Sequence, residues 1–438
     1  MEWNISDDEI LETEKLLLPN GSHFSDDAKQ VIRCWESTEV SACPGSGKTT
    51  VLLAKLKLLA DRMPLERGAG VCVLSHTNVA VNEIKDKLRG CANKLMSYPN
   101  YVGTIQSFID HYVVLPYIRK VYGQSVRPVD DRTYSNYMIR RMTNEKYQTI
   151  STLLRSGFNN ASDQYNSFVE YVMALYINKE GDLCIGNRRA RLAGADTDSA
   201  KQYTKLKEAL LINDGIIRFD DTFRYAEAAI CEYSELYTNL FSLRYQYVFI
   251  DEYQDCSNRQ RLILSKLFDQ SKCVVIMIGD PDQAIYNSNK EDTLDWVPSN
   301  STLSIASACR YNQEIAEILS PLRQDGQSIH SLIGVSGIKP VLIIYNSETI
   351  DRVIGAFISL LDKHGLTDPQ GIYKIIGYIK NEDAKGLNIQ SYWDKYDSSA
   401  RQNDDTYWSF IDEICTCLQT GRLYKAEAAV RRLIEQVQ

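Results

Sequence analysis

Short apolar runs alternate with longer segments of helical periodicity along most of the chain. Four of these runs are rich in β-branched residues and hold few polar positions, as strands buried on both faces do. They are Val71–Leu74, Tyr247–Ile250, Val274–Ile278 and Val341–Ile344. Each is followed by a polar turn and then by a helical pattern. This rhythm predicts an α/β fold with a parallel sheet.

Residues 111–215 interrupt this rhythm. They are rich in Tyr and Arg, and helical periodicity is clear at Tyr134–Met142 and Tyr165–Tyr176, whereas strand candidates are few. The pattern changes again near Pro298–Ser304. After this point we expect a strand leading into a helix over Leu303–Leu322. A strand, a helix at Ser347–His364 and a strand near Tyr373–Tyr378 are expected to follow.

Composition and charge narrow the class of protein. Charged residues make up 24% of the 438 residues and the formal net charge is −8, whereas residues 111–215 carry +4. This local excess fits either a surface for a phosphate backbone or a solvated helical face. No apolar run approaches the roughly 18 residues of a membrane span. The N-terminus is acidic, unlike a signal peptide, so we expect a cytoplasmic protein without a membrane partner.

The eleven cysteines do not suggest a disulfide framework or a zinc site. Their number is odd and they lack paired C-x-x-C spacing, which favours reduced thiols. Cys415-Thr416-Cys417 has no second pair of candidate ligands after it.

Residues 42–50 match the spacing of a phosphate-binding loop. The pattern G-x-x-x-x-G-K-[ST] is met with Ala42 in the first glycine position. Such a loop turns its N–H groups toward a triphosphate, and the following helix adds its positive end. Lys48 could reach the outer phosphates and Thr49 could bind Mg²⁺. The alternative is a glycine-containing turn with a surface lysine. The candidate ATP-binding residues here are Ala42, Cys43, Pro44, Gly45, Ser46, Gly47, Lys48, Thr49 and Thr50.

Two later strands end in polar residues that suit the same site. After Tyr247–Ile250, Asp251 is a candidate ligand of Mg²⁺ and Glu252 a candidate general base for an attacking water. After Val274–Ile278, Gln283 could contact the γ-phosphate or orient that water. The alternatives are an acidic turn that caps the next helix and a capping amide.

The ordered set of motifs resembles superfamily 1 helicases of the UvrD/Rep/PcrA type. Asp-Glu-Tyr-Gln-Asp at 251–255 and Gly-Asp-Pro-Asp-Gln-Ala-Ile-Tyr at 279–286 are similar to two family motifs. Further similarities lie at 75–84, 103–108 and 219–221. The resemblance implies that Gln30 reads adenine and that Arg310 contacts the γ-phosphate. It also implies that Thr77, Asn78 and Ser107 contact DNA, and that Tyr286 either stacks or belongs to the core.

The resemblance implies a RecA-like sheet with a helical insertion and the start of a second RecA-like domain. The expected division is a first RecA-like domain in two parts, 1–110 and 216–300, a DNA-contacting insertion at 111–215, and an apparently incomplete second domain at 301–438. ATP would bind between the two domains, and single-stranded or partly duplex DNA would cross both. The implied activity is ATP hydrolysis coupled to movement along DNA.

The sequence departs from the family pattern at several positions. Asn287-Ser288-Asn289 replaces an aromatic-Arg-Gly run, and Cys309 stands where a tyrosine usually stacks on adenine. The last two family motifs are not found, and Ala384–Ile389 is similar to one of them only superficially. The native chain is therefore either longer than these residues or lacks part of the motor.

These departures keep two hypotheses open. The first is a DNA helicase or translocase, with an RNA helicase as a variant. The second is an ATP- and DNA-sensing regulatory subunit of a nuclease complex that does not unwind DNA. The chain also resembles helicase-like subunits that pair with a TOPRIM/OLD-type nuclease, as in the Gabija anti-phage system.

Overall fold

The computed structural model describes residues 3–160, 165, 167–178, 180–186, 190–284, 296–299, 302–368, 371–377 and 387–393. The chain forms two compact units, Met1–Ser336 and Gly337–Gln438. Each unit is described separately below.

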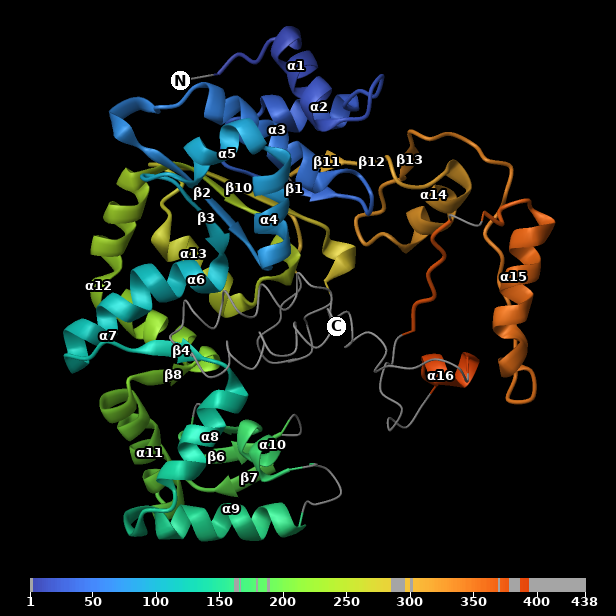
Figure 1. The fold of residues 1–438 in the computed structure, drawn as a ribbon. Coiled ribbons are helices and arrows are strands. Elements are labelled where there is room, and N and C mark those ends of the chain that lie inside the picture. Colours follow the sequence, from blue (N-terminus) through green and yellow to red (C-terminus); the bar gives the residue numbers. More distant parts are fainter. Residues whose placement is uncertain are drawn as a thin grey trace, which may run out of the picture. The chain divides into compact units, whose positions relative to one another are not determined.

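A six-stranded sheet forms the centre of the first unit (Figure 1). All neighbouring strands are parallel, in the order β11-β1-β10-β9-β2-β3. The strands are β1 (Thr38–Ala42), β2 (Gly70–Ser75), β3 (Tyr101–Thr104), β9 (Tyr245–Ile250), β10 (Val274–Gly279) and β11 (Leu303–Ile305). The α/β class and the three strands predicted before residue 300 are confirmed. Because β11 joins this sheet, the sheet continues past the expected domain boundary at residue 300.

Helices cover both faces of the sheet, and strand residues alternate between two cores. Tyr247 and Phe249 of β9 face one core, whereas Val248 and Ile250 face the other. The first core involves α1 (Asp7–Leu17), α2 (Asp26–Arg33), α3 (Lys48–Asp61), α4 (Asn78–Lys87) and α5 (Arg89–Met96). The second involves α6 (Ile105–Ile109), the π-helical turn η2 (Asp110–Val114), α7 (Leu115–Tyr122), α12 (Phe219–Arg244) and α13 (Asn258–Leu267). Burial on both faces explains the uninterrupted apolar strands.

A buried lysine joins α3 to α2 within the first core. The ammonium of Lys55 is fully buried and donates to the carbonyls of Val31 at 2.9 Å, Ile32 at 3.3 Å and Cys34. It also lies 4.1 Å from the ring centre of Trp35. These carbonyls lie at the C-terminal end of α2, where Val31 O also accepts the N–H of Cys34 at 3.2 Å. Burial lowers the pKa of Lys55 to about 7.

The segment between α7 and α12 has a core of its own. Its helices are α8 (Asp131–Arg141), α9 (Gln148–Asn160), α10 (Phe168–Met173) and α11 (Asp198–Asp214). Two small sheets accompany them: a parallel pair of β4 (Arg127–Val129) with β8 (Ile216–Arg218), and an antiparallel sheet of β5 (Leu175–Ile177), β6 (Leu183–Ile185) and β7 (Ala190–Ala193). The helix predicted over 165–176 is only partly correct, since α10 ends at Met173 and a strand follows.

The first unit ends with a short segment beside the sheet. It contains β12 (Ser307–Ala308), α14 (Gln313–Leu319), the 3-10 turn η6 (Ser320–Leu322) and β13 (His330–Ser331), which pairs with β12. The carboxylate of Asp27 on α2 accepts the N–H groups of Ala306 at 2.9 Å and Ser307 at 3.0 Å. These two bonds attach the segment to the body of the first unit.

The described part of the second unit contains helices joined by irregular segments. The 3-10 turn η7 (Ile350–Arg352) leads into α15 (Val353–Lys363), as predicted, and α16 (Ile389–Tyr392) follows. The predicted strand Val341–Ile344 is wrong, and residues 371–377 of the strand predicted near Tyr373–Tyr378 are not a strand either. The backbone groups of a strand need a neighbouring strand as hydrogen-bond partner. Residues 337–368, 371–377 and 387–393 contain no strand. The second RecA-like domain remains a prediction.

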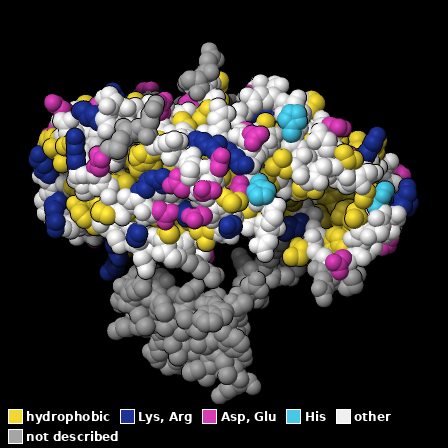
Figure 2. Space-filling model, turned by 90° about the horizontal axis from the view of Figure 1, so that it is seen from above, with side chains coloured by type: hydrophobic (Ala, Val, Ile, Leu, Met, Phe, Trp, Pro, Cys, Tyr) yellow, Lys and Arg dark blue, Asp and Glu magenta, His cyan; other side chains and the backbone are white. Residues whose placement is uncertain are grey.

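The surface of the protein mixes both signs of charge. On the face shown in Figure 2, Lys and Arg side chains lie among Asp and Glu side chains. This mixture fits the modest net charge of the chain. Within the described ranges, no helix has the length and apolar character to cross a membrane.

Candidate active site

The loop after β1 has the backbone shape of a phosphate cradle. Gly45 and Gly47 have φ values of +74° and +83°, which residues with a Cβ rarely adopt. Gly47 caps α3, which begins at Lys48. The free N–H groups at this helix start, with its positive dipole end, form an anion site. The predicted loop Ala42–Thr50 therefore lies at the carboxyl end of β1, with Lys48 as its first helical residue.

The strand end at β9 presents a buried carboxylate. Asp251 is only 2% exposed, and its N–H donates to Leu74 on the neighbouring strand at 2.8 Å. Burial, with the nearby negative charge of Glu252, raises the pKa of Asp251 to about 7. No described residue forms an ion pair with Asp251. A buried carboxyl that lacks a neutralising partner fits a divalent cation.

Glu252 occupies an unusual backbone conformation beside it. Its φ and ψ are +51° and +47°, the left-handed region, and its N–H donates to the Asp251 carboxylate at 3.0 Å. The amide of Gln254 donates to the Glu252 carboxylate at 2.7 Å. Strained residues of this kind cluster at active sites. Glu252 is thus held in place by its own backbone and by Gln254.

The end of β10 adjoins Lys48. The ammonium of Lys48 lies 3.4 Å from Gln283 Oε1 and 3.7 Å from Asp280 Oδ2. Gln283 belongs to the 3-10 turn η5 (Pro281–Gln283). The structure thus brings the predicted Gln283 to the predicted Lys48. It also adds Asp280, which is fully buried and was not a predicted site residue.

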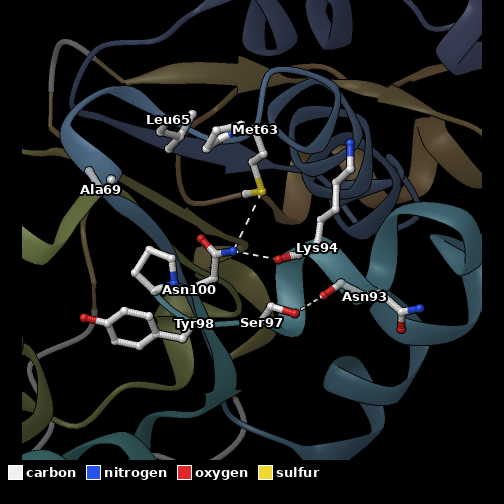
Figure 3. A pocket seen from close by; sticks show the side chains of 11 residues that line it. Met63, Leu65, Ala69, Asn93, Lys94, Ser97, Tyr98 and Asn100 are labelled. Carbon is white, nitrogen blue, oxygen red and sulfur yellow. Dashed lines mark hydrogen bonds between the residues drawn. The ribbon is translucent and has the colours of Figure 1, made fainter.

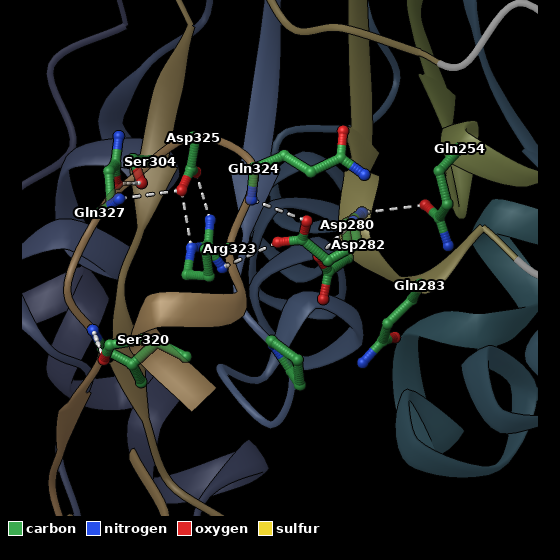
Figure 4. Close-up of polar contacts among 12 residues, drawn as sticks. Gln254, Asp280, Asp282, Gln283, Ser304, Ser320, Arg323, Gln324, Asp325 and Gln327 are labelled. Atoms are coloured by element: carbon green, nitrogen blue, oxygen red, sulfur yellow. Dashed lines mark hydrogen bonds and ion pairs between the residues drawn. The ribbon is translucent and has the colours of Figure 1, made fainter. Parts of the chain in front are cut away.

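Gln254 connects the two acidic strand ends. Its side-chain oxygen accepts the N–H of Asp280 at 2.9 Å, while its side-chain nitrogen donates to Glu252. Figure 4 shows Gln254 reaching the Asp280 backbone, with Gln283 nearby. One amide therefore fixes the candidate base relative to the turn that carries Gln283. The sequence signal for this role was the Gln of Asp-Glu-Tyr-Gln-Asp, to which no function was assigned.

Arg310 lies directly against the phosphate loop. The N–H of Cys309 donates to Gly45 O at 2.9 Å, and the hydroxyl of Tyr311 donates to Pro44 O at 2.8 Å. A Cβ placed on Gly45 would lie 2.8 Å from the Cβ of Arg310. Arg310 itself is exposed. The predicted arginine is therefore close to the loop and in the same compact unit.

Gln30, the predicted adenine contact, lies on α2 one turn after Asp27 and is exposed. Through Asp27, this helix holds the strand end that precedes Arg310. Gln30 therefore lies on the helix that is hydrogen-bonded to the segment leading to Arg310.

The predicted DNA-contact residues gather at the carboxyl ends of β2 and β3, where Ser75 and Thr104 pair in register. Thr77, Asn78 and Ser107 are all exposed. The hydroxyls of Thr77 and Thr104 cap α4 and α6. Tyr286 lies outside the described residues. Three of the four predicted positions therefore share the edge of the sheet that holds the phosphate loop.

A pocket of about 440 Å³ lies elsewhere, at the amino ends of β2 and β3 (Figure 3). Its walls include Met63, Leu65 and Tyr98. Asn100 uses both ends of its amide there, accepting from Val71 N and donating to Lys94 O, each at 2.8 Å. Ligands of open α/β sheets bind at the carboxyl ends of the strands, so this pocket is not the expected site.

Within the described residues, no group of three or more His, Cys, Asp or Glu side chains is arranged to hold a metal. Mg²⁺ in phosphate-transfer sites is commonly held by one or two protein oxygens together with phosphates and water. Thr49 and Asp251 supply the right kind of oxygen for that mode of binding.

Comparison with known proteins agrees with this geometry. Residues 25–292 match the UvrD/REP helicase N-terminal domain. Gabija protein GajB of Bacillus cereus (strain VD045) is 24% identical over 263 residues, which cover 59% of this chain and 39% of that protein. The ATP-dependent DNA helicase srs2 of Schizosaccharomyces pombe (strain 972 / ATCC 24843) is 25% identical over 262 residues, 57% of this chain and 28% of that protein.

The ATP-dependent DNA helicase PcrA of Leuconostoc citreum is 21% identical over 292 residues, 64% of this chain and 36% of that protein. In each of these pairs the match spans less than two fifths of the relative. The match to the helicase domain, in contrast, covers more than half of this chain. The chain therefore belongs to the UvrD/REP helicase family.

Proposed function

We propose that this protein is a DNA-dependent ATPase of the helicase or translocase class. The observation that carries the proposal is the convergence of three strand ends at one edge of the sheet. Lys48 after β1 lies 3.4 Å from Gln283 after β10, and Gln254 links that turn to Glu252 after β9. A phosphate loop, a carboxylate pair and a polar sensor are the parts that phosphate transfer from a nucleotide requires.

Each group has a role in this proposal. Lys48 and the N–H groups of the loop bind the outer phosphates of ATP. Thr49 and Asp251 hold Mg²⁺, which would neutralise charge on the phosphates. Glu252 accepts the proton of the attacking water. Gln283 and Arg310 contact the γ-phosphate, one from η5 and the other from the segment over Gly45.

Single-stranded DNA is the proposed partner at the same edge. Thr77, Asn78 and Ser107 are exposed there, and short polar side chains suit contacts with the DNA backbone. Tyr286 is proposed as a stacking residue on the basis of the family resemblance. Hydrolysis at the phosphate loop would then change contacts a short distance away along the sheet edge.

The similarity to Gabija protein GajB supports a narrower proposal. We propose a cytoplasmic role in anti-phage defence, together with a TOPRIM/OLD-type nuclease. Co-purification with a nuclease of this type from the native host is the direct check. If the protein is recovered without such a partner while its ATPase is intact, this narrower proposal falls and the ATPase proposal stands.

The experiment for the main proposal measures ATP hydrolysis with and without single-stranded DNA. We expect DNA to stimulate hydrolysis and Lys48→Ala to abolish it, because the alanine cannot reach the phosphates. Lys57→Ala on the same helix is the matched control, since Lys57 pairs with Asp61 away from the loop at 2.7 Å. Hydrolysis that ignores both DNA and Lys48 would overturn the proposal.

Single-stranded RNA and a strand-displacement assay sharpen the result. Stronger stimulation of ATP hydrolysis by RNA than by DNA would indicate that RNA is the substrate. DNA-stimulated hydrolysis without displacement would favour translocation or regulation of a partner over unwinding.

A further inference from the structure

Arg323 is a buried arginine close to the phosphate loop that no motif predicted. It follows η6 in the first unit, and its side chain is only 3% exposed. Two of its guanidinium nitrogens bind the carboxylate of Asp325, with Nε at 2.8 Å from Oδ1. The third, Nη1, is buried and has no hydrogen-bond partner among the described residues. A buried donor without a partner is costly, so its position calls for a physical reason.

This nitrogen faces the turn that carries Gln283. Nη1 of Arg323 lies 4.0 Å from Asp282 Oδ2, and the N–H of Gln324 donates to Asp282 Oδ1 at 3.0 Å. In Figure 4, Arg323 lies between Asp325 on one side and Asp282 on the other. The segment 323–325 is therefore attached to η5 through both its backbone and its charge.

Asp280, at the start of this turn, has a similar buried atom. Its Oδ1 accepts the N–H of Asp282 at 3.2 Å, but its Oδ2 is buried and forms no hydrogen bond within the described part of the chain. That oxygen lies 3.7 Å from the ammonium of Lys48. Burial raises the pKa of Asp280, while the positive charges of Lys48 and Arg323 oppose this effect. The carboxylate thus depends on two cations, one of which is the proposed phosphate-binding lysine.

We infer that Arg323 is a positioning residue that holds the Asp280–Gln283 turn in place when nucleotide phosphates engage Lys48. This inference rests on the proposed function and deepens it. Phosphates draw the ammonium of Lys48 away from Asp280, which leaves a buried carboxylate with one cation nearby. Arg323 then supplies the remaining positive charge, and its Nη1, 4.0 Å from Asp282 Oδ2, can donate to this turn. Without Arg323, phosphate binding at Lys48 has to overcome an uncompensated buried charge.

The test compares Arg323→Met with Asp325→Asn. Arg323→Met removes the guanidinium. Asp325→Asn removes the negative charge that pairs with the guanidinium and leaves the positive charge of Arg323 facing η5. The readouts are the dissociation constant of a non-hydrolysable ATP analogue with Mg²⁺ and the melting temperature with and without that analogue. A purely structural role would lower the melting temperature of both variants and leave the stabilisation by the analogue intact.

We expect Arg323→Met to weaken analogue binding about 10- to 100-fold, the range expected when a charge-assisted hydrogen bond is lost. Asp325→Asn should change it less than about threefold. Arg323→Lys keeps the charge but offers a single donor group, so it should restore part of the affinity and serves as the second variant if Arg323→Met does not fold.

Analogue affinity within about threefold of wild type in Arg323→Met, or equal losses in Arg323→Met and Asp325→Asn, would overturn the inference. If Arg323→Met does not fold, wild-type affinity in Arg323→Lys combined with a loss in Asp325→Asn would overturn it equally. A wild-type protein that binds no analogue would instead overturn the proposed function. The two failures are therefore distinguishable.

Discussion

The two edges of the central sheet are built from the same strands but differ in how their polar groups are satisfied. At the carboxyl edge, buried atoms of Ser46, Ser75 and Asp280 have no hydrogen-bond partner in the described structure. At the amino edge, Asn100 uses its amide fully, and the pocket of about 440 Å³ beside it has Met63, Leu65 and Tyr98 in its walls. A sizeable pocket thus lies at the edge opposite to the phosphate loop.

This difference distinguishes the amino-edge pocket from the site that we propose at the carboxyl edge. Buried polar atoms without partners destabilise a fold. Their presence therefore suggests a functional role, such as binding a ligand or an ion. The carboxyl edge adds a left-handed Glu252 and a buried Asp251 to these atoms. Buried polar atoms without partners and a left-handed residue next to a buried carboxylate thus coincide at the edge that we propose to be active.

The largest expected effect is the loss of catalysis in Glu252→Gln. The amide keeps the size of the side chain but cannot accept the proton of the attacking water, so ATP hydrolysis should fall about 10²- to 10⁴-fold. Nucleotide binding, measured separately, should change little. Glu66→Gln is the matched control, because Glu66 is exposed beside the amino edge. Comparable losses in the two variants would remove the distinction between the edges.

A pair of glycines provides an intermediate test. Gly45 and Gly68 both have positive φ values, +74° and +66°, so alanine at either should cost about 1–2 kcal/mol in backbone strain. At Gly45 the new Cβ would also lie 2.8 Å from Arg310 Cβ, whereas at Gly68 no atom lies within 4 Å. Gly45→Ala should therefore reduce ATP affinity about tenfold or more through the displaced segment, and Gly68→Ala should only lower stability. Equal ATP affinities in the two variants would contradict the contact.

The last prediction concerns Lys55, a fully buried lysine of α3, and is measured as stability against pH. The pKa of Lys55 is lowered from 10.5 to about 7 in the folded state. Between these values the unfolded chain binds more protons, so the free energy of unfolding should rise with pH. The gain attributable to Lys55 is up to about 1.4 kcal/mol per pH unit, measured as the difference between wild type and Lys55→Met. Lys57→Met is the control, and an identical pH slope in Lys55→Met and wild type would exclude the effect.

Local sequence patterns predicted the parts of the site that depend on local geometry. The phosphate loop requires glycine at particular φ values, and the acidic residues directly follow apolar strands, so spacing alone identified Lys48, Asp251 and Glu252. Parallel strands place their carboxyl ends at one edge, which brought Gln283 to Lys48 as expected. These inferences needed only the order of the strands and their direction.

Long-range partners could not be predicted in this way. Arg323, Asp325 and Lys55 lie in segments without a motif, and their roles depend on which loop packs against which turn. The incorrect prediction of a strand at Val341–Ile344 has the same cause. Its apolar residues suit a strand, but Val341, Leu342 and Ile344 are 56%, 85% and 87% exposed, and the described second unit offers no pairing partner. Strand propensity depends on neighbours that the local pattern does not contain.

The left-handed backbone at Glu252 has a consequence for how this position can evolve. Folding alone would favour glycine there, since glycine adopts φ near +51° without steric cost. A change to glycine should therefore relieve strain while removing the proposed base. Selection for stability and selection for turnover act in opposite directions at this residue. Natural relatives that have given up hydrolysis but kept nucleotide binding would be expected to drift toward glycine or asparagine here.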